Sequence, residues 1–285
     1  MAHPGDWSCA LTVEAVPRAT PPPATSRPWW RWLVSDNGAR YTSRLLALII
    51  WQLAGTAFVR IPTPAGTIGF LVEEARRGEL LSNLMVSLRR AGIALSIVLV
   101  LGILIGFAMG RWWRIRFFLN DLVLVGIALP AFIWALLGVM WWGFSNVAPI
   151  VVCILSATPM LVVNTHEGAR STSASLRAMS DAYRVPVRRQ FRWLVLPSMM
   201  EYIVAGFRFS VLSGWGAVLL VEWFGNNEGA GYRAHYYYDS GNFNGLMGWG
   251  LVMMIVIMTF DRAVMDRILR RYRRWRVGRE EWSGS

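Results

Sequence analysis

The chain has 285 residues, of which 55% are hydrophobic and only 16% are charged. Soluble domains usually carry about 25% charged residues, so this composition argues against a soluble domain and favours an integral membrane protein. The formal net charge is +12, but the arginines lie in short runs between apolar segments, a pattern typical of membrane-orientation signals. No nucleic-acid-binding motif accompanies this charge, and we therefore expect no nucleic-acid partner.

Residues 1–42 are predicted to form a cytoplasmic tail. Its middle is rich in proline between Pro17 and Pro28, which disfavours a packed structure. The aromatic and basic residues near its end suit the headgroup region of a membrane, where amphipathic rings gather. They are Arg27, Trp29, Trp30, Arg31 and Trp32. A leader without a specific partner explains the same composition equally well.

An all-α membrane domain is predicted over residues 43–276, followed by a cytoplasmic tail at 277–285. Crossing a bilayer takes roughly 17–25 helical residues, and six apolar segments approach or reach that length. We predict membrane spans at about 45–59, 91–109, 119–142, 147–163, 198–221 and 246–260.

Three features between and within the spans carry structural expectations. Residues 60–90 mix Glu and Arg with apolar residues, which suits an amphipathic helix outside the membrane. Gly102, Gly106 and Gly110 recur every four residues and predict one helix face that approaches a neighbour closely. Pro130 interrupts the helical hydrogen bonding of the third span and predicts a kink, which either lines a pathway or is packed over.

Six spans place both termini on one side of the membrane. With the N-terminus in the cytoplasm, 22 arginines fall in inside segments and 6 in outside segments, while Arg208 lies within a span. This asymmetry predicts an N-in, C-in topology. It places residues 164–197 in the cytoplasm and residues 222–245 in an outer loop.

The polar, basic segment 164–197 interrupts the apolar second half of the chain. Its length and composition predict two short helices against the cytoplasmic face of the membrane, which present side chains to a soluble partner. Pro197 is predicted to start the next membrane helix, where its missing N–H costs little.

Short motifs in and around this segment resemble the permeases of ABC importers. Leu194–Pro197 is similar to the end of the family's EAA loop, whose pattern is Glu-Ala-Ala, three residues, Gly, nine residues and Ile-x-Leu-Pro. The flanking matches are Asn164–Thr165, Gly168, Arg170–Ser171, Gly206–Arg208, Glu222–Gly225, Gly229–Tyr232, Asp261, Ser87–Arg90 and Gly102–Gly106. By their order and spacing, the chain is identified over about residues 60–276 as a member of the nitrate/sulfonate/taurine/bicarbonate branch.

The chain departs from this pattern at its signature positions. Arg184 stands where the family has the glycine, and Ala178–Ser180 stand in place of Glu-Ala-Ala. The family's glycine lets the chain turn between two short helices, and arginine reaches a positive φ less readily. Pro186 can supply the break instead by starting the second helix, and Asp181 can replace the missing acid. We therefore expect a coupling loop of altered geometry.

The resemblance implies that this loop contacts an ATPase. The residues expected to form the contact are Gly168, Arg170, Asp181, Arg184, Pro186, Arg188, Leu196 and Pro197.

A second set of candidate residues lies seven residues apart on the fifth span and forms one slowly winding stripe. It consists of Glu201, Arg208, Trp215 and Glu222. Arg208 lies about 16 Å along the helix from Pro197, and ionisable residues at such depth usually face a bundle interior or a water-filled path. The stripe, with Pro130, is a candidate lining of the translocation path, with Arg208 as a positive site for an anion. A structural residue paired to a carboxylate on another helix explains Arg208 equally well.

The resemblance implies a type I ABC importer permease core that moves a small solute across a bacterial inner membrane by alternating access. The implied partners are two cytoplasmic ABC ATPase subunits, a second permease subunit (identical or paralogous), a periplasmic substrate-binding protein and membrane lipid. The chain is expected to be no enzyme and to bind no cofactor. It contains no lysine and so no GxxxxGK[ST] phosphate loop, which assigns ATP and Mg²⁺ to the ATPase subunit.

The branch implies a small anion as the solute, such as nitrate, bicarbonate, a sulfonate or taurine. Two alternatives stay open. One is a degenerate permease that pairs with a more regular paralogue, and the other is a polytopic membrane enzyme or scaffold without ATPase coupling. The cysteines and histidines offer no metal-ligand spacing.

Overall fold

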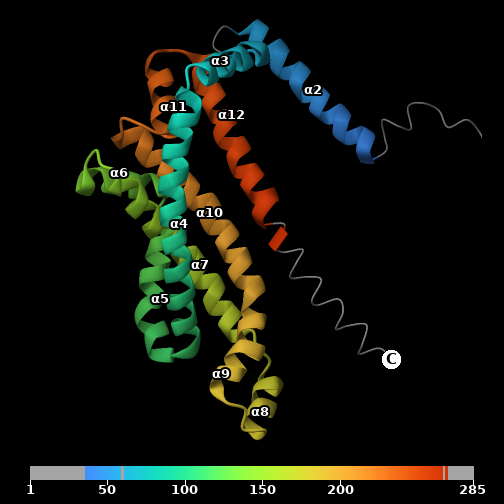
Figure 1. Ribbon diagram of the computed structural model, residues 1–285, viewed down its shortest axis with the longest axis vertical. Helices are drawn as coiled ribbons and strands as arrows, with labels where there is room; N and C mark the ends of the chain where they lie inside the picture. Colours follow the sequence, from blue (N-terminus) through green and yellow to red (C-terminus); the bar gives the residue numbers. More distant parts are fainter. Residues whose placement is uncertain (1–35, 59–60, 266, 269–285) are drawn as a thin grey trace, which may run out of the picture. The chain divides into compact units, whose positions relative to one another are not determined.

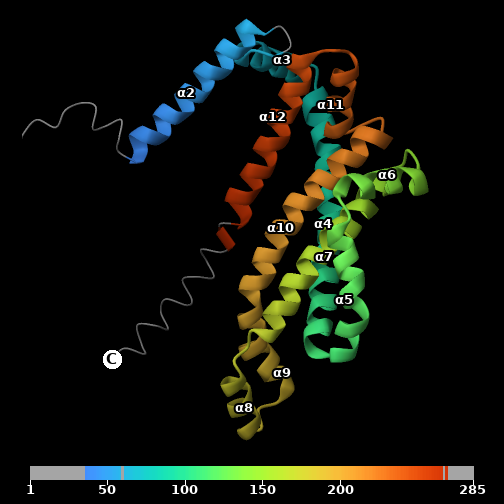
Figure 2. The same ribbon diagram turned by 180° about the vertical axis from the view of Figure 1, so that it is seen from behind.

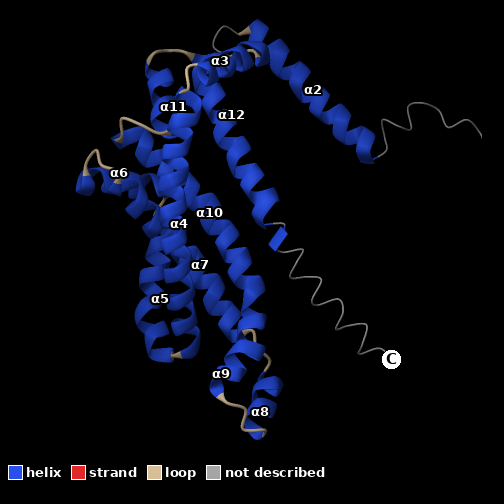
Figure 3. Ribbon diagram, viewed as in Figure 1, coloured by secondary structure: helices blue, strands red, loops and turns tan. Residues whose placement is uncertain are grey.

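The structure, a computed structural model, describes residues 36–58, 61–265 and 267–268. All secondary structure in these ranges is helical (Figure 3), which confirms the predicted all-α fold. Most of the predicted N-terminal tail and all of the predicted tail 277–285 lie outside the described residues. The chain divides into two units, Met1–Ile50 and Trp51–Ser285, and helix α2 (Asp36–Ala57) begins in the first and ends in the second.

The second unit holds the remaining helices, labelled in Figure 1. They are α3 (Pro64–Arg76), α4 (Glu79–Arg111), α5 (Trp113–Ala128), α6 (Ala131–Trp142), α7 (Val147–Arg170), α8 (Ala174–Ala182), α9 (Val187–Gln190), a π-helical turn η1 (Phe191–Val195), α10 (Leu196–Gly225), α11 (Ala230–Asp239), α12 (Phe243–Phe260) and a second π-helical turn η2 (Asp261–Met265).

Four helical runs are long and apolar enough to cross a membrane. They are Glu79–Arg111, Val147–Arg170, Val187–Gly225 and Phe243–Met265. The pair α5 and α6, bent by 97°, adds a fifth candidate, and Leu45–Ala57 is a shorter apolar helix. Each of the six predicted spans overlaps one of these elements, while the count of six and the N-in, C-in orientation stay predictions.

Several helices differ in extent from the predicted segments. The second predicted span is part of a longer helix that begins at Glu79, and the polar first part of this helix is buried by contacts with distant segments. Helix α7 continues to Arg170, so the predicted coupling segment begins inside a helix. The predicted outer loop 222–245 contains α11 and the ends of α10 and α12.

Pro130 breaks the predicted third span instead of kinking it. Leu129 before it is extended, with φ −72° and ψ 120°, as expected of a residue that precedes proline. Helix α6 starts immediately after Pro130 and runs at 97° to α5. The 12 residues of α6 are too few to cross a bilayer alone.

Helix α7 is the centre of the second unit, and α4 and α10 pack along it (Figures 1 and 2). The predicted glycine face of α4 is confirmed as the contact. A Cβ atom on Gly102 would lie 2.6 Å from the Leu161 side chain, and one on Gly106 would lie 2.6 Å from the Thr165 Cβ atom. Only a residue without a side chain allows the two backbones to come this close.

Helix α10 approaches the other side of α7 in the same way. A Cβ atom on Gly206 would lie 2.6 Å from the Asn164 Cβ atom, and the buried Ser210 hydroxyl donates to the Ala157 carbonyl oxygen at 2.8 Å. Helices α4, α7 and α10 thereby form a three-helix core that positions both ends of the bundle.

This packing predicts opposite effects for two glycines of the same helix. Gly106→Ala places a methyl group against Thr165 and the Val162 carbonyl oxygen and should destabilise the protein by about 1–3 kcal/mol. Gly92→Ala, at a position open within 4 Å, should stabilise α4 by up to about 1 kcal/mol. Thermal unfolding of the detergent-purified protein measures both, and equal midpoints would contradict the packing.

Candidate functional site

The predicted coupling segment begins as the last two turns of α7. Gly168 is buried there, and a Cβ atom on it would lie 2.8 Å from the Tyr202 Cβ atom. Gly168 is therefore a packing position between α7 and α10. Arg170 is exposed in the last turn of α7, where a cation suits the helix dipole.

Helix α8 is short but has a defined beginning and end. The Ser173 hydroxyl accepts a hydrogen bond from the Leu176 backbone N–H at 3.3 Å. At the other end, the Val185 N–H donates to the Ser180 carbonyl oxygen and the Arg184 N–H to that of Asp181, both at 3.0 Å. This pair of bonds is the Schellman motif, which ordinarily places glycine where Arg184 stands.

Arg184 adopts the left-handed conformation of that motif, with φ +50°. The chain thus turns at the position of the family's glycine, although the residue there is arginine. Pro186 does not replace this turn: it precedes α9 as its N-cap. The conformation costs a residue with a side chain roughly 1–2 kcal/mol.

The turn is held by a contact between its two short helices. The Gln190 side-chain amide donates to the Asp181 carboxylate at 2.8 Å, which links α9 to α8 across the turn. Arg188 is exposed on α9.

Pro197 does not start a helix. It is the second residue of α10, and the helical run from Val187 to Gly225 is continuous through the π-helical turn. The Leu196 N–H bonds to the Phe191 carbonyl oxygen, five residues back. Proline lacks the N–H of the usual four-residue bond and its ring crowds the preceding turn; a π turn directly before Pro197 widens the helix there.

The predicted stripe on α10 divides into two parts. Arg208 forms an ion pair of 2.5 Å with Asp261, and 39% of its side chain remains exposed. Glu201 is half-buried. Trp215 is packed against Ala91 and Cys153, and Glu222 is fully buried. A path-lining role thus stays a prediction for Glu201 and Arg208, which are partly exposed. Trp215 and Glu222 lie in the packed interior.

The partner of Glu222 is Arg90, which is not among the predicted site residues. The Arg90 guanidinium is 2% exposed and donates to the Glu222 carboxylate at 2.8 Å and to that of Glu228 at 2.9 Å. It also hydrogen-bonds the side chain of Asn146. Arg90 therefore joins α4 and α10 to the two turns that contain Asn146 and Glu228. These contacts balance the guanidinium charge, which would otherwise be costly to bury.

The same network caps helix α11. The backbone N–H groups of Gly229, Ala230 and Gly231 donate to the side chains of Asn83, Ser87 and Glu222 at 2.8–3.0 Å. These are orphan donors of a helix N-terminus, and the carboxylate also suits the positive end of the helix dipole.

Gly229 has a special place in the cap. Its φ is +111°, and a Cβ atom on it would lie 2.5 Å from the Glu222 carboxyl carbon. The turn can therefore fold over the carboxylate only with glycine there.

A second ionic cluster joins α3 to α11. Glu74 is buried and forms an ion pair with Arg233, and the Tyr237 hydroxyl donates to the Glu74 carboxylate at 2.9 Å. Burial, followed by the hydrogen bond with Glu74, raises the pKa of Tyr237 to about 12. The phenol therefore stays protonated, and keeps donating, throughout the physiological pH range.

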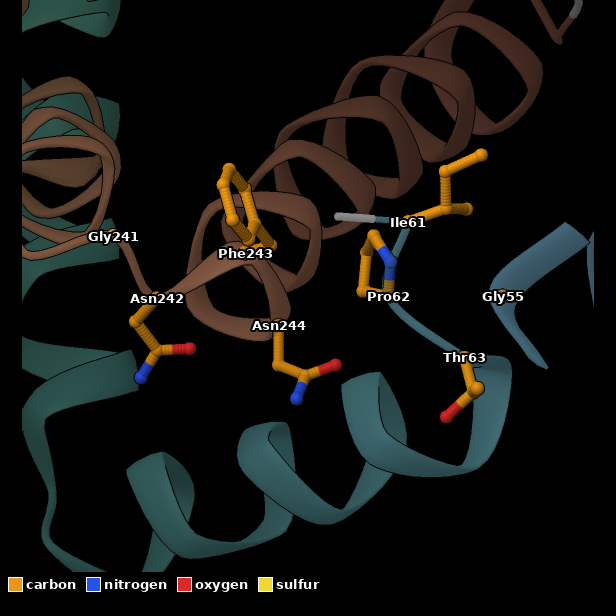
Figure 4. Close-up of a pocket in the computed structure, with 8 residues that line it drawn as sticks. All are labelled: Gly55, Ile61, Pro62, Thr63, Gly241, Asn242, Phe243 and Asn244. Atoms are coloured by element: carbon orange, nitrogen blue, oxygen red, sulfur yellow. The ribbon is translucent and has the colours of Figure 1, made fainter. Parts of the chain in front are cut away.

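A cavity of about 330 Å³ lies beside these elements, between the turn before α3 and residues Gly241–Asn244 (Figure 4). Three polar side chains line it, and the Asn244 side-chain oxygen among them is buried without a hydrogen-bond partner within the described residues. Thr63 accepts from the Gly66 N–H and Asn242 from the Gly245 N–H, so both are helix caps. We assign the cavity no ligand.

One signal in the sequence could have found the Arg90 network. Asn83, Ser87 and Arg90 are spaced four and three residues apart and so lie on one helix face. Read as a face, they predict a buried polar stripe. A count of charges places Arg90 only in a segment on the outer side of the membrane and does not predict its buried contacts.

The left-handed turn predicts that Arg184→Gly stabilises the α8–α9 segment by about 1 kcal/mol. Amide hydrogen exchange of this segment should then slow about fivefold. Arg188→Gly, within helix α9, should accelerate exchange because glycine weakens helices. Faster exchange in Arg184→Gly would show that the turn does not depend on this conformation.

The buried ion pair predicts non-additive mutations. Arg90→Met leaves the Glu222 carboxylate buried and unpaired and should cost about 3–5 kcal/mol. Adding Glu222→Gln removes that charge and should recover part of the loss. Arg77→Met breaks the exposed pair with Glu73 and should change stability by under about 1 kcal/mol. Thermal unfolding of the variants tests this, and additive losses for the double variant would contradict it.

Comparison with known proteins identifies the family to which this chain belongs. Residues 98–275 match the family model of the binding-protein-dependent transport system inner membrane component. A permease protein of Bacillus subtilis named for aliphatic sulfonates transport, SsuC, is 24% identical over 80% of this chain and 84% of its own length. The taurine transport system permease protein TauC of Escherichia coli is 25% identical over 71% of this chain and 78% of its own.

The nitrate import permease protein NrtB of Synechococcus elongatus is 24% identical over 69% of this chain and 68% of its own length. Among solved structures, an inward-facing MetNI methionine ABC transporter matches with a TM-score of 0.55 and 16% identity, over 68% of this chain and 94% of that one. This likeness shows a shared fold. From the family match, the chain is a multi-pass membrane protein and belongs to the inner-membrane components of binding-protein-dependent transport systems.

Proposed function

We propose that this chain is a permease subunit of an ATP-driven importer in a bacterial inner membrane, and that residues 171–195 dock a cytoplasmic ATPase subunit. The observation that carries the proposal is the α8–α9 hairpin at one end of the bundle (Figure 1). It retains the turn at the family's glycine position despite Arg184. That retention favours a working coupling loop over a degenerate one.

The hairpin presents a mixed apolar and basic surface. Tyr183 is 79% exposed and Val187 is 78% exposed, next to the exposed Arg184, Arg188 and Arg189. Large apolar side chains at a solvent-facing tip are costly unless a partner covers them. A soluble subunit with an apolar groove and an acidic rim fits this surface.

The connections of the hairpin suit it to transmit movement. On one side, only residues 171–173 separate α8 from α7; on the other, α9 continues through the π turn into α10. Since α7 and α10 pack closely, a displacement of the hairpin by ATP-driven closure of its partner would be passed into the core. This is the alternating-access role proposed for the segment.

The solute is proposed to be a small anion delivered by a periplasmic binding protein. The names of SsuC, TauC and NrtB, which refer to sulfonates, taurine and nitrate, support this class. Arg208, with 39% of its side chain exposed beside Asp261, is the candidate positive site on the path. Selection among anions is assigned to the binding protein. ATP and Mg²⁺ are assigned to the ATPase subunits, and a second permease subunit completes the assembly.

Truncating the hairpin tip should uncouple the complex without unfolding the chain. Tyr183→Ala combined with Val187→Ala should lower co-purification with the ATPase subunit and ATP-driven uptake at least tenfold, with an unchanged unfolding midpoint. Phe144→Ala removes an aromatic ring that is 75% exposed at the opposite end and should change neither. If no ATPase subunit co-purifies with the wild-type chain, the proposed function is contradicted.

A further inference from the structure

Four arginines at the hairpin end of the bundle lack a carboxylate partner. Arg111 ends α4, Arg114 and Arg116 lie in the first turn of α5, and Arg170 lies in the last turn of α7. The structure records no ion pair for any of them in the part of the chain that it describes. Their charge is therefore balanced by water or by an anion from outside the described chain.

Three helices bring these arginines to one level. Gly126 of α5 lies against Pro159 of α7, and the two helices run in opposite directions (Figure 1). Arg116, ten residues before Gly126, is therefore level with about residue 169 of α7. A Cβ atom on Gly110 would contact the Ala169 side chain, so the end of α4 lies at this level as well.

Arg116 and Arg170 come together at the ring of His166. Both guanidinium groups act electrostatically on this histidine, and residues 166 and 170 share one face of α7 because they are four apart. The His166 side chain is only 12% exposed, and its Nε2 atom is buried without a hydrogen-bond partner among the described residues. A buried polar atom of this kind calls for a partner, and two guanidinium groups beside it suit an oxyanion.

Two carboxylates lie near enough to be weighed against an anion. Glu167 faces the His166 Nδ1 atom at 3.4 Å with 58% of its side chain exposed, so it offsets one of the two guanidinium charges and leaves a positive balance. Asp121 lies five residues beyond Arg116, which is about 140° around α5, and its recorded polar contact is the adjacent Asn120. It therefore lies away from the cluster.

The cluster lies at the level where phospholipid headgroups are expected. The long uncharged stretch of α4 ends at Arg111, and the next two residues, Trp112 and Trp113, are 52% and 67% exposed. Arginine and tryptophan gather at the edge of the hydrocarbon. The α8–α9 hairpin extends beyond the turn between α4 and α5 along the bundle (Figures 1 and 2), so a partner docked on its tip lies farther from the membrane.

The neighbouring surface of α5 suits acyl chains. Phe117 and Phe118 are 82% and 80% exposed, more than any other large apolar side chain that the structure describes. Both directly follow Arg116 along the helix. A cationic cluster next to exposed aromatic rings matches a ligand with an anionic head and an apolar tail.

We propose that Arg116, His166 and Arg170 bind the phosphate of an anionic phospholipid, whose acyl chains lie along the apolar side of α5. Arg170 directly precedes the proposed docking segment 171–195, so the bound lipid would hold the last turn of α7 where the hairpin leaves the membrane. The inference goes beyond the proposed function and does not depend on it, because lipid binding is measured without the ATPase.

Native mass spectrometry of the delipidated, detergent-purified full chain tests the site. One molecule of dioleoylphosphatidylglycerol should bind about tenfold more tightly than dioleoylphosphatidylcholine, whose ammonium group offsets the phosphate charge. Arg116→Gln combined with Arg170→Gln should abolish this preference. Arg188→Gln combined with Arg189→Gln removes the same charge from the exposed hairpin and should leave the preference unchanged.

Conservative variants separate a binding role from a structural one. His166→Phe keeps a ring but removes the Nε2 atom and should weaken phosphatidylglycerol binding about fivefold, whereas His166→Gln retains an amide N–H and should weaken it less. Arg116→Lys combined with Arg170→Lys keeps the charge and should retain part of the preference. The unfolding midpoint without lipid should be the same for these variants and the wild type.

Three results would overturn the lipid site. An equal loss in the hairpin variant would show that net charge alone attracts the lipid. Displacement of phosphatidylglycerol by millimolar inorganic phosphate would assign the cluster to a soluble anion. Unchanged lipid binding in the Arg116→Gln, Arg170→Gln variant, with loss of ATPase co-purification, would assign the cluster to the ATPase. The proposed function is contradicted separately, when no ATPase co-purifies with the wild-type chain, whatever the lipid result.

Discussion

The close approach of α4 and α10 to α7 is the constraint on which the rest of the structure depends. In a bilayer, lipid tails are as apolar as leucine, so helices associate through packing and hydrogen bonds rather than by expelling water. Gly106 and Gly206 permit that packing, and Ser210 adds a hydrogen bond. Because α7 and α10 leave the core at one end, the chain between them must turn there; because α4 and α10 meet at the other end, Arg90 can reach Glu222.

The two ends of the bundle handle their polar groups in opposite ways. At the α11 end, charges are buried and paired: Arg90 with Glu222, and Arg233 with Glu74. Each of these pairs joins segments far apart in the sequence and fixes a turn or a helix N-terminus. At the hairpin end, Arg184, Arg188 and Arg189 are exposed, and the turn is held by short-range bonds. One end is thus suited to hold its shape, and the other to receive a partner.

The sequence predicted what depends on local pattern and missed what depends on distant contacts. The glycine face of α4 follows from residues within a few positions of one another. At Pro130 the local pattern predicts a kink, where the structure has a break. Around Arg184 it predicts altered geometry, where the chain still turns at the position of the family's glycine. The start of α4 at Glu79 does not follow from local pattern, because Ser87 meets its partner Glu222 only 135 residues later. Arg184 adopts a left-handed backbone conformation that arginine rarely takes, because the two backbone hydrogen bonds of the turn outweigh the conformational cost.

The length of α4 sets a relation between the protein and the thickness of its membrane. Its 33 residues correspond to about 50 Å, well beyond the roughly 30 Å of hydrocarbon in a bilayer. The uncharged stretch between Arg90 and Arg111 measures about 32 Å and matches that thickness. A thicker or thinner bilayer would have to tilt α4 or deform around it. Since α4 is joined to α7 along its glycine face, such a tilt would reorient the whole core. The orientation of the core in this permease therefore depends on the thickness of the membrane.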